Sequence, residues 1–492
     1  MRTWTRKDFL KASLLTGSAA LLTRSALGAP AVVAPGSPNG DVRVAVVGFN
    51  GKGAQHIKTF GDVPGVRVVA LCDVDSDVLA AQVKKFADRG QKVAAYRDYR
   101  ELLNDKSIDA VVIATPNHWH ALMTIWACQA GKDIYVEKPV SHSIWEGRKA
   151  VEAARKYNRV VQTGTQSRSD EALREFFAYL QAGNLGAVKW ARGLGYKARP
   201  SIGKTSGPQP LPASVDYDLW LGPAAMTPLR RQKLHYDWHW FWATGNADIG
   251  NQGAHQMDMC RLALGQKGLP PSVMCIGGRF AQDDDAETPN TQIVVLPYEP
   301  APLIFEVRGL PRKAGDVALD NYRGIRIGIT VQCENGYFVG SAGGGWVYDN
   351  DNKRVKHFEG TAGATHAANF IDAVRQRRRE VLNADIEEGH ITAALCHCAN
   401  ISYRLGQDTT AEAVQEAIRS DALTRETYGR LLEHLRANQA DLQKTPIVQG
   451  PCLSIVPGRE AFVSNAKGDL GDRANALLKD TYRAPFVVPE NV

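Results

Sequence analysis

A glycine-rich loop followed at a fixed distance by an aspartate is the most informative combination in this 492-residue sequence. The loop is Gly48-Phe49-Asn50-Gly51-Lys52-Gly53, and the acid is Asp73. Glycines allow a tight turn close to a pyrophosphate, which sits on the N-terminus of the helix that follows. A carboxylate at this spacing binds a ribose hydroxyl and repels a 2′-phosphate. The pattern therefore indicates a dinucleotide site that favours NAD over NADP, formed by Gly48, Asn50, Gly51, Gly53 and Asp73.

The loop departs from the G-x-G-x-x-G pattern because Asn50 stands at the middle glycine. Asparagine tolerates a positive φ, so the turn remains possible, although close backbone approach is less free. A glycine-rich turn in another α/β sheet is the alternative. Apolar runs at 42–47 and 66–72 favour the dinucleotide unit, because they are typical of buried parallel strands.

Lys138 is placed for chemistry on a hydroxyl group. It follows a predicted strand at 133–136 and precedes Pro139, which fixes the turn. An ammonium held in this way can bind a hydroxyl and lower its pKa, or relay its proton. A surface lysine before a proline is the alternative. A second strand, predicted at 109–114, ends at the same edge of the sheet, where open α/β sheets form their ligand crevice.

Together these motifs resemble the Gfo/Idh/MocA family, which includes glucose–fructose oxidoreductase and inositol dehydrogenase. The similarity covers about residues 42–405 and rests on GFNGKG, CDVD, ATPNHWH and VEKPVSHS. The resemblance implies an α/β fold, with an N-terminal Rossmann domain built on a doubly wound parallel sheet. A C-terminal α/β domain with an open, mainly antiparallel sheet is expected to follow.

The resemblance also implies site residues. Lys138 and His255 are the expected catalytic pair. The further cofactor-binding residues are Thr115, Asn117, His120, Glu137, Lys138 and Gln166. The expected substrate-binding residues are Arg168, Trp238, Asn251 and His255.

The segment around His255 departs from the family pattern D-x-G-x-H, because it reads Asn251-Gln252-Gly253-Ala254-His255. Asn251 can form hydrogen bonds but cannot take a proton, and Asp248 is a candidate replacement. A lone histidine near an apolar run can also be a satisfied core residue. Aromatic residues crowd 217–242, where Trp238 could line a saccharide pocket or anchor a loop core.

The N-terminus reads as an export signal. Arg2, Arg6 and Lys7 precede an apolar run at 12–23 and small residues at 26–29. Thr5 to Lys11 resembles the twin-arginine signal, with Lys7 in place of the second arginine. We therefore expect a periplasmic or otherwise exported protein that uses the twin-arginine machinery. A frayed amphipathic N-terminus or an uncleaved anchor is the alternative.

The expected organisation has four parts. Residues 1–40 are the signal and linker, and residues 41–165 are the NAD-binding Rossmann domain. Residues 166–406 are the substrate-binding domain, and residues 407–492 are a helical extension and tail of unassigned role.

Composition narrows the class of function. The formal net charge is +7, and residues 1–28 supply +4 of it. The remaining charge of +3 does not indicate a nucleic-acid-binding surface. Cys396-His397-Cys398 lacks a second ligand pair at zinc spacing, so no metal is expected. A homo-oligomer acting on a small carbohydrate is expected.

Three functions remain open. The first is an NAD(P)-dependent oxidoreductase acting on a sugar or polyol hydroxyl, with tightly bound cofactor. The second is an NAD-dependent glycoside hydrolase that oxidises C3 transiently and eliminates the leaving group. The third is a binding protein without catalysis, against which Lys138 and His255 argue. Because no NAD pool exists outside the inner membrane, an exported protein favours a redox-neutral cycle on bound cofactor.

Overall fold

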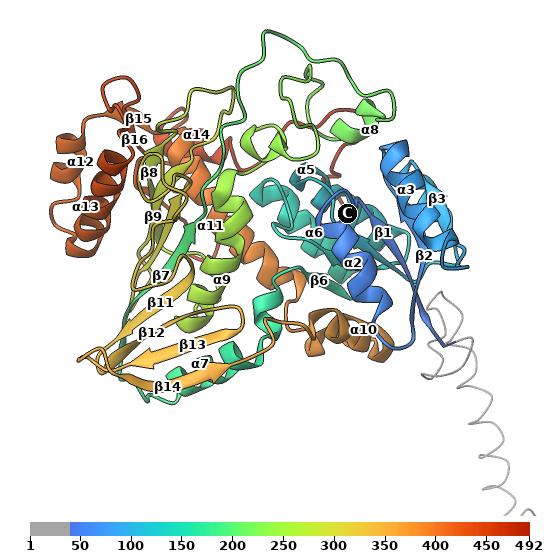
Figure 1. Cartoon of the computed structure of the whole chain (residues 1–492), viewed down its shortest axis with the longest axis horizontal. Coiled ribbons are helices and arrows are strands. Elements are labelled where there is room, and N and C mark those ends of the chain that lie inside the picture. Colours follow the sequence, from blue (N-terminus) through green and yellow to red (C-terminus); the bar gives the residue numbers. More distant parts are fainter. Residues whose placement is uncertain (1–39) are drawn as a thin grey trace, which may run out of the picture.

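The computed structural model describes residues 40–492, which form two sheets with helices packed against them (Figure 1). The expected export signal lies outside the described residues. In Figure 1 the first sheet, blue to teal, lies beside the larger second sheet.

The first sheet is parallel and has the strand order β3-β2-β1-β4-β5-β6. Its central strand β1 buries apolar side chains on both faces, as a parallel strand covered by helices requires. The expected doubly wound Rossmann sheet is therefore confirmed, and its order reverses between β1 and β4, where such sheets bind ligands. The strands are β1 (Val42–Val47), β2 (Val66–Cys72), β3 (Ala94–Tyr96), β4 (Ala110–Ile113), β5 (Asp133–Val136) and β6 (Val161–Thr163). The helices are α2 (Lys52–Gly61), α3 (Ser76–Ala87), α4 (Tyr99–Asn104), α5 (Asn117–Gln129) and α6 (Ile144–Lys156).

The second sheet is mixed and mainly antiparallel, as expected. Its order begins β14-β13-β12-β11-β7-β10-β9-β8, and β7 pairs in parallel with β10. Helices α7, α9 and α11 bury one face of this sheet, which forms the largest core of the described residues. The strands are β7 (Val188–Tyr196), β8 (Ser272–Gly278), β9 (Thr291–Leu296), β10 (Leu303–Arg308), β11 (Ile327–Cys333), β12 (Gly336–Ser341), β13 (Gly344–Tyr348) and β14 (Arg354–Glu359). The helices are α7 (Glu171–Gln181), α9 (Ala254–Ala263), α10 (His366–Gln376) and α11 (Ile386–Arg404).

The segment after residue 406 joins this second sheet instead of standing apart from it. Strands β15 (Gln407–Thr409) and β16 (Ile447–Gln449) extend the edge beyond β8, and β17 (Leu453–Ser454) pairs with β8. Helices α12 (Ala411–Ala417) and α13 (Ala422–Ala437) cover the outer face of β8, β9 and β10. After α14 (Leu470–Asn475), the chain returns to the first domain (Figure 1).

Residues 40–492 contain neither a membrane-spanning helix nor a cluster of metal ligands. No helix there has both the length and the apolar character needed to cross a bilayer. No group of three metal-ligating side chains gathers at one point, and Cys396, His397 and Cys398 are buried on α11.

Candidate active site

A cavity of about 440 Å³ opens where the carboxyl edge of the first sheet meets the second domain. Its walls come from the loop after β1, the ends of β2, β4 and β5, and the segment leading into α9. The structure brings most of the predicted site residues together here: Gly48, Asn50, Gly51, Asp73, Thr115, Asn117, His120, Glu137, Lys138, Gln166, Trp238, Asn251 and His255. Gly53 and Arg168 lie outside its lining.

The glycine loop suits a pyrophosphate. Gly48 has a φ of +73°, and a Cβ there would lie 3.0 Å from the side chain of Thr115. A Cβ on Gly53 would lie only 2.0 Å from the carbonyl oxygen of Gly48, so the start of α2 packs directly on the loop. Gly51 instead faces open space and precedes α2 without a side-chain cap. The first N–H groups of α2 are therefore available to an anion in the cavity.

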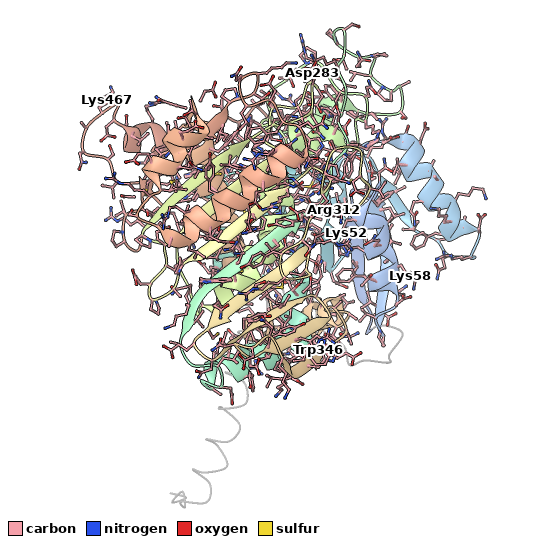
Figure 2. All side chains as sticks on the ribbon, turned by 60° about the vertical axis from the view of Figure 1, so that its left-hand side comes forward. Lys52, Lys58, Asp283, Arg312, Trp346 and Lys467 are labelled. Atoms are coloured by element: carbon pink, nitrogen blue, oxygen red, sulfur yellow. The ribbon has the colours of Figure 1, made fainter. Side chains whose placement is uncertain are left out.

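Two charged side chains flank this loop. Asp73 accepts backbone hydrogen bonds from Phe49 at 3.0 Å and Asp75 at 3.1 Å, which fixes the loop against the end of β2. Burial raises the pKa of Asp73, and these two N–H donors oppose the rise. Lys52 lies at the exposed start of α2 (Figure 2). It also belongs to the lining of the cavity. A carboxylate suited to a ribose and a cation suited to a phosphate thus line the same cavity as the loop.

Lys138 connects the two domains inside the cavity. Its Nζ donates to the backbone oxygen of Asn251 at 2.7 Å and to Asn251 Oδ1 at 3.1 Å. Burial lowers the pKa of Lys138, and the negative charges of Glu137 and Asp248 limit that decrease. The ammonium is therefore held in one place and loses its proton more readily than a free lysine.

Glu137 fixes the strand end from which Lys138 projects. Burial by itself would raise the pKa of Glu137, but the hydrogen bond from His56 Nε2, at 2.7 Å, and nearby cations bring it below its usual value. Gln166 Nε2 donates to the same carboxylate at 3.2 Å. A Cβ on Gly164 would lie 2.8 Å from this carboxylate, so a side chain at position 164 would displace it.

Thr115, Asn117 and His120 hold the end of β4 against the Lys138 turn. His120 Nδ1 lies 2.6 Å from the Pro139 oxygen, and His120 Nε2 lies 2.8 Å from the Thr115 oxygen. Asn117 Nδ2 donates to Asn246 Oδ1 at 2.9 Å, which ties the cavity wall to the second domain.

The segment before His255 is a π-turn, η3 (Ile249–Gly253), which leads into α9. Single π-turns are rare and recur at functional sites, because the wider turn redirects side chains. This turn brings Asn251 to Lys138, while His255 lies in the first turn of α9 and lines the cavity. Burial and the charge of Lys138 lower the pKa of His255 to about 3, so its imidazole is neutral near pH 7.

Asp248 does not supply the missing carboxylate at this position. It is buried and forms a bidentate ion pair with Arg199, at 2.9 and 2.6 Å. Its Oδ1 lies 3.4 Å from Asn251 Nδ2, so it can orient Asn251 without entering the cavity.

Arg168 likewise forms ion pairs outside the cavity lining, where it connects neighbouring helices. Its guanidinium pairs with Asp258 on α9 at 2.7 Å and with Glu388 on α11 at 3.0 Å. These two carboxylates bind its Nε and Nη2, and Arg168 does not line the cavity, so the structure separates it from the other predicted substrate residues.

His239 is a cavity residue that the sequence analysis did not single out. Its Nδ1 lies 2.6 Å from the Tyr236 oxygen and therefore carries the proton, which leaves Nε2 as an acceptor. The ring stacks on Trp238 at a centroid distance of 3.6 Å, and burial lowers its pKa to about 3. A histidine within a run of tryptophans was the signal that could have identified it.

Two family models match the chain. Residues 42–165 match the Gfo/Idh/MocA oxidoreductase family model of an NAD-binding Rossmann fold, and residues 186–306 match its C-terminal α/β domain. The solved WlbA dehydrogenase from Bordetella pertussis, in complex with NADH and UDP-GlcNAcA, has a similar fold. It superposes with a TM-score of 0.54 at 19% identity, over 74% of this chain and 97% of that one.

Curated relatives match the N-terminal part. Inositol 2-dehydrogenase from Salmonella typhimurium is 30% identical over 159 residues, which are 32% of this chain and 46% of the relative. Glycosyl hydrolase family 109 protein 2 from Shewanella sp. (strain MR-4) is 36% identical over 158 residues, which are 29% of this chain and 35% of the relative. The chain thus spans less than half the length of these two relatives.

Proposed function

Because models of the Gfo/Idh/MocA oxidoreductase family match a part of each of its two domains, we propose that this chain oxidises a hydroxyl group of a sugar or polyol with NAD that stays bound. One observation carries the proposal. A single cavity is lined both by the glycine loop and by Lys138, Asn251 and His255. Cofactor binding and hydroxyl chemistry are therefore adjacent.

The residues present fit the cofactor. Gly51 leaves room beside the free N–H groups of α2, and Asp73 stands where a ribose would lie. Bound NAD would supply the hydride acceptor. Lys138 donates a hydrogen bond to the substrate hydroxyl and lowers its pKa, and neutral His255 accepts the proton. Asn251 holds the Lys138 ammonium in place through its two oxygens.

Substitution of Lys138 tests this assignment. Lys138→Ala should reduce kcat by about 10²- to 10⁴-fold, because a positioned proton-transfer group contributes that much. NAD affinity, measured by tryptophan fluorescence, should change little. Lys52→Ala is the matched control, since it removes a lysine at the pyrophosphate end and should weaken NAD binding instead. Unchanged turnover in Lys138→Ala would remove Lys138 from the mechanism.

A glycoside hydrolase is the second candidate, and His239 favours it. Oxidation at C3 acidifies the C2 hydrogen, loss of that proton expels the group on C1, water then adds, and the hydride returns to C3. This sequence needs a base besides the one that takes the hydroxyl proton, and His239 offers a free Nε2 in the same cavity. The likeness to a family 109 glycosyl hydrolase supports this reading.

Turnover of aryl glycosides in deuterated water separates the two candidates. Deuterium at C2 of the released sugar supports the hydrolase, because the C2 proton exchanges during elimination. A keto-sugar without C2 deuterium supports the oxidoreductase. If neither product forms and the protein has no NAD affinity, both proposals fail.

Export and retained cofactor are part of the same proposal. The Arg6-Lys7 signal supports twin-arginine export to the periplasm of a protein folded around its NAD. Purified protein should then contain nicotinamide, detectable by its near-ultraviolet absorbance after reduction. Fractionation of the periplasm tests the location. The homo-oligomer stays a prediction, which native mass spectrometry can test.

A further inference from the structure

A segment of the second domain crosses the cofactor crevice of the first. This crossing segment, residues 212–242, includes α8 (Tyr217–Leu221) and runs above α5 in Figure 1. It forms a bridge between Val215 and Asp75, and the N–H of Ser76 donates to the Ser214 oxygen at 2.9 Å. His235 Nε2 lies 2.9 Å from Asp75 Oδ2, beside the expected ribose position. The segment is therefore attached to the first domain at the rim of the crevice.

The crossing segment also supplies part of the cavity wall. Leu219, Trp220 and His235 line the cavity together with the glycine loop and Asp73. A dinucleotide that reached from Asp73 to Lys138 would pass beneath this segment. Its release would require the segment to move.

The C-terminal tail, residues 479–492, supports the same wall from behind. Phe486 is 1% exposed and packs edge-on against Trp119, with ring centroids 5.4 Å apart. It also contacts Trp126 at 6.4 Å, and both tryptophans line the cavity from α5. Val488 lies in the core of the first domain. The tail thus belongs structurally to the first domain, although it follows the whole second domain in sequence.

The tail also contacts the crossing segment. Arg483 Nη1 donates to Asp218 Oδ1 at 2.7 Å, and Nη2 donates to the Asp218 backbone oxygen at 2.9 Å. The N–H of Arg483 donates to the Pro223 oxygen at 3.3 Å. Trp119 completes the connection, because its indole N–H lies 3.1 Å from the oxygens of both Leu219 and Trp220. Tail, α5 and crossing segment are therefore joined around one tryptophan.

We propose that the C-terminal tail clamps the crossing segment over the dinucleotide and sets the rate at which NAD leaves. This inference rests on the proposed binding of NAD in the cavity. Arg483 and Phe486 are positioning residues, because they act through Asp218, Trp119 and Trp126 without contacting the cavity themselves.

The dissociation rate of NADH tests the clamp. The full-length protein is loaded with NADH and chased with excess NAD, and loss of energy transfer from the cavity tryptophans to NADH is followed. Phe486→Ala should speed dissociation about tenfold, since an aromatic contact contributes about 1.4 kcal/mol. Arg483→Glu should also speed it, because two carboxylates would then face each other at Asp218.

Charge reversal provides the decisive control. The double variant Asp218→Arg with Arg483→Glu restores the opposite charges and should return dissociation toward the wild-type rate. Lys467→Glu makes the same charge change on the far side of the second domain from the blue helices and should have no effect (Figure 2). Unchanged dissociation in Phe486→Ala and Arg483→Glu would overturn the clamp. A wild-type protein that never binds NADH would instead overturn the proposed function.

Discussion

At the scale of single residues, the exchange of a carboxylate for an amide at position 251 determines how Lys138 ionises. A carboxylate within hydrogen-bonding distance would favour the ammonium, whereas Asn251 contributes only neutral oxygens. Burial therefore lowers the pKa of Lys138 with less opposition from neighbours. Because His255 is neutral near pH 7, the Lys138 ammonium is the cation of this catalytic pair that can act on the substrate hydroxyl.

The pH dependence of catalysis follows from this arrangement. If the Lys138 ammonium is needed, kcat/KM falls as pH rises through a pKa below that of free lysine. Asn251→Asp places a carboxylate 3.1 Å from Nζ, raises this pKa by about one unit or more and extends activity to higher pH. A pH–rate profile of both proteins checks this. An activity that rises through the same pKa would show that neutral Lys138 acts as the base.

At the scale of elements, the turn from β1 into α2 uses its glycines for different physical reasons. Gly53 is required by packing, because its Cβ would meet the Gly48 oxygen at 2.0 Å. Packing does not require glycine at position 51, since no protein atom lies within 4 Å of the position of its Cβ. Its backbone, with a φ of 171°, is one that any residue can adopt.

Two alanine substitutions separate these roles. Gly51→Ala should leave the thermal midpoint nearly unchanged but weaken NAD binding, because its methyl group would occupy the pyrophosphate space. Gly53→Ala should lower both the thermal midpoint and the affinity for NAD, because α2 must move away from the loop. Calorimetry and NAD titration of the two variants check the difference. Equal losses of stability would show that Gly51 also has a packing role.

Elements with a clear hydrophobic pattern could be predicted from the sequence. The bounds of β1, β2 and β5 agree with the apolar runs at 42–47, 66–72 and 133–136. The π-turn η3 could not be predicted, because its geometry depends on contacts with Lys138 and other distant residues. For the same reason the sequence did not show that Arg168 and Asp248 pair with distant charges. A pattern identifies a polar residue, but its partner is set by tertiary structure.

At the scale of the whole molecule, a buried ionic network joins the second sheet to α13. Glu306 on β10 accepts from Arg192 on β7 at 2.6 Å, from Tyr196 at 2.7 Å and from Arg430 on α13 at 2.6 Å. Glu306 and Arg192 are 1% and 0% exposed, so water cannot replace a lost partner. The segment after residue 406 is thus part of the sheet domain energetically as well as topologically.

Removing the central charge tests this view. Glu306→Gln should lower the free energy of unfolding by about 3 kcal/mol, because buried Arg192 would keep only the half-exposed Glu426 as its counter-charge. Glu334→Gln breaks the exposed pair with Lys189 and should cost less than about 1 kcal/mol. Urea denaturation of both variants measures the difference. Similar small losses would show that the network contributes little to stability.

The position of Phe486 and Val488 in the first domain has a consequence for biosynthesis. The core that contains β1, β4 and α5 includes side chains that leave the ribosome more than 350 residues after Val111 does. Contacts this distant in sequence form late, because a long loop must close first. The first domain therefore cannot complete its core before residues 479–492 have been translated, and the finished nucleotide pocket appears only after that. Cofactor loading would then report that residues 479–492 have been synthesised and have packed against the first domain.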